Sequence, residues 1–159
     1  MTEKTSENMR QALADTSLEA ARNSVLAKLA QKSERPNAAR LLKALALADE
    51  AQARRILALA RGKLGGLDDG LRDLAQRKAQ EDALRLKQEQ ALAEGRATEA
   101  ALFGQILQAG RSHAELLTDP DKSPPVLFVC QICGYLIHTE APENCPVCQA
   151  VRERFDKVE

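Results

Sequence analysis

The chain has few aromatic residues, few cysteines and no excess of either charge. Its aromatics are three Phe and one Tyr, with no Trp, and its 23 basic residues balance 23 acidic ones. A balanced charge gives no indication of a nucleic-acid partner. No stretch approaches the ~20 consecutive apolar residues of a membrane span, and the N-terminus lacks the apolar core of a signal peptide. We therefore expect a cytoplasmic protein with no nucleic-acid and no membrane partner.

The four cysteines all lie in the last thirty residues and form two C-x-x-C motifs, Cys130/Cys133 and Cys145/Cys148. Each motif folds into a tight turn that directs two sulfurs at one point, so two facing turns complete the tetrahedral thiolate site that soft metals prefer. Disulfides or free thiols are the alternative. However, a disulfide within one C-x-x-C is typical of thioredoxin-like enzymes, and no βαβ pattern surrounds these cysteines. The spacing predicts a metal site, and thiols kept for metal fit a reducing compartment.

The segment around the cysteines is too short to fold without help. Residues 126–159 number only 34, and chains below ~40 residues usually need a metal or a disulfide. Three of the four aromatics, Phe128, Tyr135 and Phe155, flank the cysteines and predict a miniature core. We expect this module to unfold without its metal.

The rest of the chain is rich in Ala, Leu, Glu, Lys, Arg and Gln, which favour helices. Turn residues divide it into four predicted helices at about 5–33, 37–62, 67–94 and 98–117. The breaks are Ser33 to Pro36, the glycines at 62, 65 and 66, Gly95, and Asp119-Pro120. Short loops imply antiparallel neighbours, so we predict a mainly α protein in which an antiparallel four-helix bundle precedes a small β domain. The predicted boundaries are 1–118 for the bundle, 119–125 for the linker and 126–159 for the metal domain.

Polar residues interrupt the apolar stripes of these helices at similar heights. Helical spacing places Asp49 and Gln52 on the core-facing stripe of the second helix, Lys78 and Glu81 on that of the third, and His113 on that of the fourth. Such residues usually form internal hydrogen bonds or lie at a solvated edge. Their shared height also allows a polar layer across the bundle.

The order of helical bundle, linker and cysteine motifs resembles the rubrerythrin family. The specific match is Val129-Cys130-Gln131-Ile132-Cys133-Gly134-Tyr135 together with Glu140-Ala141-Pro142-Glu143-Asn144-Cys145-Pro146-Val147-Cys148. These segments are similar to the rubredoxin-like site of that family, which implies one iron per chain, with zinc as the alternative metal. One departure is Gln149, at a position that is usually glycine because the backbone there often has a positive φ. We expect this to cost ~1 kcal/mol.

The resemblance also implies a ferritin-like bundle whose di-iron centre uses glutamates and Glu-x-x-His pairs. This chain contains no Glu-x-x-His. Placed by pattern, the corresponding positions become Asp49 and Gln52, Lys78 and Glu81, and Gly110 and His113, so that only Glu81 and His113 keep ligand chemistry. We therefore predict a degenerate bundle site without a di-iron centre. We also predict that Lys78 replaces the metal charge by pairing with Asp49 or Glu81, because a buried unpaired ammonium costs several kcal/mol.

Three functions are open at this point. The first is an iron-binding redox protein that transfers one electron through its four-cysteine site. The second is a zinc-bearing helical scaffold, and the third is a residual rubrerythrin peroxidase, with a role in oxidative stress, that uses His113 and nearby acids. The family resemblance further implies a homodimer and a redox partner protein or an NAD(P)H-dependent reductase.

Overall fold

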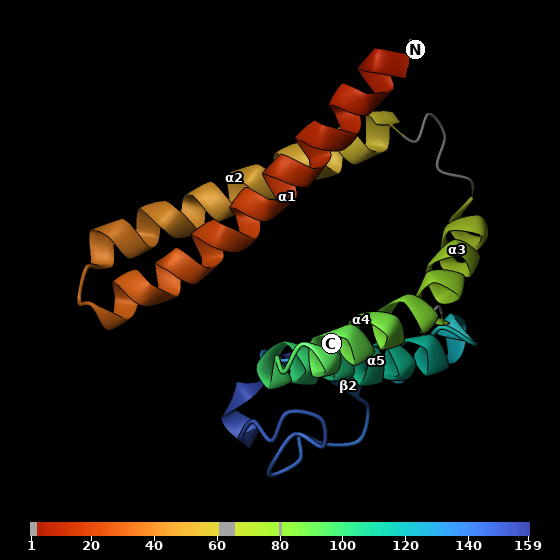
Figure 1. Cartoon of the computed structure of the whole chain (residues 1–159). Helices are drawn as coiled ribbons and strands as arrows, with labels where there is room; N and C mark the ends of the chain where they lie inside the picture. The colour runs from red at the N-terminus through yellow and green to blue at the C-terminus, as the bar shows by residue number, and fades with distance from the viewer. Residues whose placement is uncertain (1–2, 61–65, 80) are drawn as a thin grey trace. The chain divides into compact units, whose positions relative to one another are not determined.

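The computed structural model describes the backbone of residues 3–60, 66–79 and 81–159, and the side chains of residues 4–59, 66–76 and 81–159. Within these residues the chain forms helices α1 (Glu3–Lys32), α2 (Pro36–Ala60), α3 (Leu67–Ala79), α4 (Asp82–Ala93) and α5 (Ala97–Leu116), followed by a small sheet (Figure 1). The prediction of a mainly α protein with a small C-terminal β domain is confirmed. None of the described helices is both long enough and apolar enough to cross a membrane.

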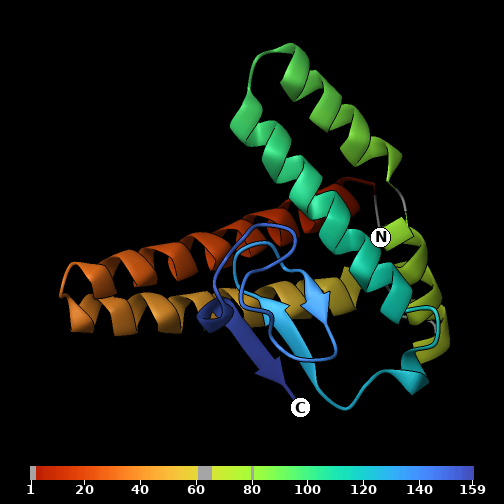
Figure 2. The same cartoon turned by 90° about the horizontal axis from the view of Figure 1, so that it is seen from below.

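The chain divides into two compact units, Met1–Gly65 and Gly66–Glu159. In the first, α1 and α2 lie side by side as an antiparallel hairpin (Figures 1 and 2). Pro36 begins α2, as suits a residue without an N–H at the first helical position, and this explains the predicted break. Small side chains allow the two helices to pack closely. The buried residues of this seam are Ala20, Ala27, Ala39 and Ala46.

The second unit begins with α3, and here the predicted helix 67–94 is wrong, because the structure divides it into α3 and α4. The first hydrogen bonds of α4 start from the Glu81 carbonyl, which accepts from the N–H groups of Leu84 and Arg85 at 3.1 and 2.9 Å. Asp82 then supplies a carboxylate to the first turn, where the helix dipole favours negative charge. Helix-forming residues continue through this point, so local propensity alone does not predict the break.

Helices α4 and α5 form a second hairpin, and the predicted turn at Gly95 is correct. Gly95 has a φ of +71°, a conformation that glycine adopts without steric cost. The Arg96 N–H closes the turn on the Ala91 carbonyl at 2.8 Å. As in the first hairpin, the buried residues of α5 are small, namely Ala100, Ala109 and Ser112. The predicted break at the glycines of 62–66 lies mostly outside the described residues.

The C-terminal module contains three short strands. They are β1 (Leu127–Cys130), β2 (Leu136–Ile137) and β3 (Phe155–Val158), joined in the order β2-β1-β3 with both neighbours antiparallel (Figure 2). Two short 3-10 helices, η1 (Pro120–Lys122) and η2 (Arg152–Arg154), precede β1 and β3. β2 contacts α5, so the module lies against a helix of its own unit. The domain boundaries at 119 and 126 stay a prediction.

Candidate metal centre

Four sulfur atoms converge in the C-terminal module. The Sγ atoms of Cys130, Cys133, Cys145 and Cys148 all lie within 4.8 Å of one another. The Cys130–Cys148 and Cys133–Cys145 pairs are each 3.6 Å apart. A tetrahedral ion with ~2.3 Å bonds to sulfur requires sulfurs ~3.8 Å apart, whereas a disulfide requires ~2.05 Å. The spacing therefore fits four ligands of one metal and excludes disulfides among these free thiols.

The first knuckle is a turn closed by its own backbone. The Cys130 N–H donates to the Tyr135 carbonyl, and the Gly134 N–H donates back to the Cys130 carbonyl, both at 2.9 Å. Gly134 has a φ of +74°, which reverses the chain immediately after Cys133. The two cysteines of the motif are thereby presented from one tight loop.

The second knuckle repeats this geometry. The Cys145 N–H donates to the Ala150 carbonyl at 2.7 Å, and the Gln149 N–H donates to the Cys145 carbonyl at 2.9 Å. Gln149 has a φ of +60°, at the position equivalent to Gly134. The predicted positive φ at Gln149 is confirmed, and the turn forms although its residue is not glycine.

Backbone N–H groups surround the sulfurs. Those of Ile132 and Cys133 donate to Cys130, that of Tyr135 donates to Cys133, and that of Ala150 donates to Cys148. Such donors stabilise negative charge on sulfur and so favour the thiolates that metals bind.

The thiols differ in how easily they ionise. Burial of Cys130 acts to raise its pKa, but the backbone N–H donors and the hydrogen bonds to the Cys148 and Cys133 thiols together outweigh it, and the pKa falls below its ordinary value. Burial raises the pKa of Cys133 far above its ordinary value, despite the Tyr135 N–H that acts to lower it. The pKa of Cys148 is also raised, chiefly by burial. One thiolate is thus readily accommodated, and a cation among the sulfurs would supply the charge that lets all four ionise.

The cluster is closed on one side and open on the other. Cys130 and Cys145 are 1% and 0% exposed, whereas Cys133 and Cys148 are partly exposed. The edge between Cys133 and Cys148 is therefore the side of the cluster that solvent reaches.

Comparison with known proteins agrees with this geometry. Residues 128–156 match the family model described as rubrerythrin, rubredoxin-like domain. Solved structures of nigerythrin, a rubrerythrin-family protein, in its mixed-valence, partially reduced and fully reduced states are 26%, 26% and 25% identical. The TM-scores are 0.51, 0.53 and 0.51, and each match covers 97% of this chain and 86% of the nigerythrin chain. The C-terminal module thus matches the rubrerythrin rubredoxin-like domain, and the chain as a whole is similar to nigerythrin. No curated protein matches it closely enough to count as a relative.

His113 of α5 contacts the metal module. Its Nε2 lies 2.7 Å from the Gly134 carbonyl oxygen, in the turn of the first knuckle. Its neighbour Ser112 is buried, and the Ser112 Oγ accepts the Leu136 N–H at 3.3 Å. His113, which its helical position marked as a possible ligand in the bundle, therefore contacts the C-terminal module instead.

Asp49 and Gln52 lie in the α1–α2 hairpin. Asp49 is half-buried, and its carboxylate accepts a hydrogen bond of 2.9 Å from the Asn23 side chain of α1. Gln52 is exposed. Asp49 thus forms the internal hydrogen bond that is the usual role of a polar residue on a core stripe.

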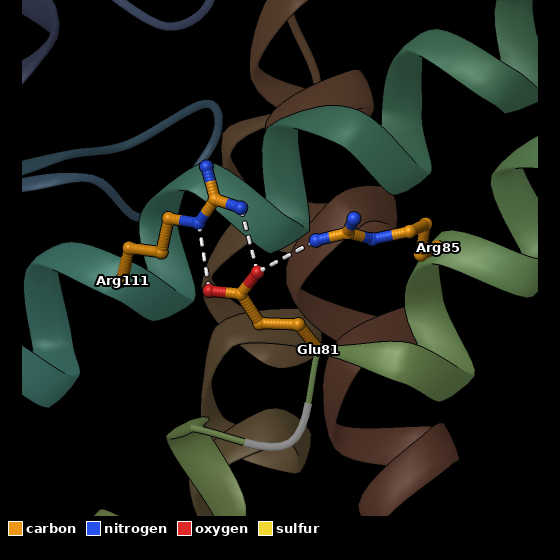
Figure 3. Close-up of polar contacts among 3 residues, drawn as sticks. All are labelled: Glu81, Arg85 and Arg111. Atoms are coloured by element: carbon orange, nitrogen blue, oxygen red, sulfur yellow. Dashed lines mark hydrogen bonds and ion pairs between the residues drawn. The ribbon is translucent and has the colours of Figure 1, made fainter.

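Glu81 forms an ion pair in the second unit. Arg111 of α5 donates to both of its carboxylate oxygens, at 2.7 and 2.6 Å, and Arg85 approaches one of them at 3.2 Å (Figure 3). The Arg111 hydrogen bonds are the main cause that holds the Glu81 pKa below its ordinary value. Lys78, predicted to pair with Asp49 or Glu81, has a side chain that lies outside the described residues.

Sequence reasoning missed Ser112 and Arg111. Ser112 lies beside His113 but outside the apolar stripe, and Arg111 is one of many charged residues on helical surfaces. A clue existed in the size of Ser112, since a small polar residue suits a close contact with a loop. No local pattern marks Arg111, whose partner is 30 residues away.

Among the residues whose side chains are described, the four cysteines are the one group of three or more His, Cys, Asp or Glu that is positioned for a metal. The C-terminal module thus contains a preformed metal site.

Proposed function

We propose that this protein is a rubrerythrin-like redox protein that holds one iron in its four-cysteine site and transfers one electron at a time. The convergence of four sulfurs at tetrahedral spacing, in a rubredoxin-like module, carries the proposal. Bound iron would supply a ferric and ferrous couple. The chain holds the four thiolates in two rigid turns, so that little rearrangement accompanies a change of charge.

The surroundings of the sulfurs support a redox role. N–H donors to Cys130, Cys133 and Cys148 stabilise the more negative, reduced state of the site. The open edge at Cys133 and Cys148 gives a partner access to the ligands. Beside it in sequence, Ile132 and Val151 are 60% and 51% exposed. We propose that a redox partner protein or an NAD(P)H-dependent reductase docks at this edge, and that the chain acts as a homodimer.

The proposal does not include a complete di-iron peroxidase centre. Two irons bring at least four positive charges, which several carboxylates must balance. Of the acids at the corresponding positions, Asp49 is hydrogen bonded to Asn23 and Glu81 is engaged by Arg111 and Arg85. Both acids therefore have partners that metal binding would have to displace.

Metal analysis with a visible spectrum tests the proposal. Aerobically purified protein should be red, contain about one iron per chain, and bleach with dithionite. Cys145→Ala is the matched variant and should be colourless. Colourless wild-type protein that contains zinc would instead support the helical scaffold.

A second measurement separates the carrier from the enzyme. About two further irons per bundle, with hydrogen-peroxide turnover that disappears in His113→Ala, would establish the residual peroxidase and contradict the carrier. We expect neither result.

A further inference from the structure

His113 is connected to a cysteine sulfur through a single peptide group. The Gly134 carbonyl, which the His113 ring contacts at 2.7 Å, and the Tyr135 N–H belong to the same peptide bond. That N–H donates to the Cys133 sulfur. The order of atoms is therefore imidazole N–H, carbonyl oxygen, amide N–H, sulfur.

The chemistry of the first contact determines the proton position. A carbonyl oxygen only accepts, so Nε2 of His113 must carry the hydrogen, whether the ring is neutral or charged. The histidine is then a fixed donor to this peptide. A donor at the carbonyl end withdraws electron density from the amide and makes its N–H a stronger donor, because hydrogen bonds in a chain polarise one another.

Neighbouring contacts of α5 keep this arrangement in place. Ser112 is 8% exposed and accepts the Leu136 N–H, so α5 holds the chain on both sides of Tyr135. Ser112 Oγ in turn donates to the Ala109 carbonyl at 2.8 Å, which orients the hydroxyl. His113 also borders an open, mostly apolar hollow of about 320 Å³, lined chiefly by leucines.

We infer that His113 is a positioning residue that raises the reduction potential of the four-cysteine centre by polarising the Gly134–Tyr135 peptide toward the Cys133 sulfur. This inference rests on the proposed function, since it assumes that the centre changes charge. A stronger N–H donor stabilises the added negative charge of the reduced state more than the oxidised state. Helix α5 would thereby tune the potential of a metal site to which it contributes no ligand.

Variants can distinguish whether His113 only holds α5 against the module or also tunes the reduction potential. His113→Phe keeps an aromatic ring and removes the donor, whereas His113→Gln keeps a donor of similar reach. Ser112→Ala removes the neighbouring contact to Leu136 without touching the Gly134 carbonyl. The chain has one other histidine, His138, which is exposed on the module. His138→Phe is the matched control.

The first measurement is the midpoint potential of full-length iron protein. His113→Phe should lower the ratio of reduced to oxidised protein at a fixed potential about tenfold, which is ~59 mV for one electron. His113→Gln should recover most of this shift, Ser112→Ala should shift the potential less than His113→Phe does, and His138→Phe should differ little from the wild type. Equal potentials for His113→Phe and His138→Phe, or no recovery with Gln, would overturn the inference.

The second measurement does not need iron. In full-length zinc-loaded protein, the Tyr135 amide proton should move upfield in His113→Phe and stay in place in His138→Phe. An unchanged Tyr135 resonance would overturn the inference even if the potential shifts. If the protein binds no iron, the proposed function fails, and the zinc experiment still decides whether His113 polarises the peptide.

Discussion

The two knuckles differ at one residue, and exchanging that residue tests the backbone argument. Gln149 and Gly134 occupy equivalent positions, with φ of +60° and +74°. A side chain in this region costs ~1–2 kcal/mol, and glycine costs ~0.5–1 kcal/mol of additional unfolded-state entropy. Gln149→Gly should therefore stabilise the folded module by ~1 kcal/mol. Gly134→Ala should destabilise it similarly, because the added Cβ meets no atom within 4 Å and only the conformational cost remains.

Because we expect the module to fold only with its metal, these changes should appear in metal affinity. At ~1.4 kcal/mol per tenfold, Gln149→Gly should bind zinc about fivefold more tightly, and Gly134→Ala about fivefold more weakly. Competition with a chelator measures both. Gln149→Ala is the control, since it removes the side chain and keeps the conformational demand, and it should match the wild type. If the Ala and Gly variants at 149 behave alike, the reasoning from φ is refuted.

Three further predictions concern the metal, acid pH and the helix seam. Cys145→Ala should abolish metal binding and unfold the C-terminal sheet while the helical circular dichroism persists; a cooperative loss of helix would contradict this. Because the Glu81 pKa is lowered in the folded state, chiefly by Arg111, its stabilising effect is present above the ordinary value of 4.5 and is lost as the pH falls through the lowered pKa. The Tm difference between the wild type and Glu81→Gln should therefore shrink on acidification, and a constant difference would count against the ion pair. Ala100, 2% exposed, should tolerate Leu poorly, at a cost of ~1–3 kcal/mol in thermal unfolding, whereas exposed Ala101→Leu should change stability by less than ~0.5 kcal/mol; equal effects would exclude a tight seam.

Features with local causes could be predicted from the sequence. Pro36 and Gly95 mark helix boundaries for reasons local to each residue. Proline restricts φ and lacks an N–H, whereas glycine readily adopts the positive φ that ends a helix. The positive φ of Gln149 follows from its place in a C-x-x-C turn. The break between α3 and α4 was missed, because Glu81 lies in a segment of good helix formers and its main partner, Arg111, comes 30 residues later.

The sequence by itself determined that this protein has a metal module. The spacing of the cysteines within each motif already decides how each pair of sulfurs is presented, through hydrogen bonds that span only a few residues. Only the tertiary structure decided what the polar residues of the helices do. Helical periodicity places His113 on an inward stripe, but whether that stripe meets a metal, another helix or the Gly134 carbonyl depends on which segments pack against it. That packing is a property of the whole fold, because it depends on contacts between residues far apart in the chain.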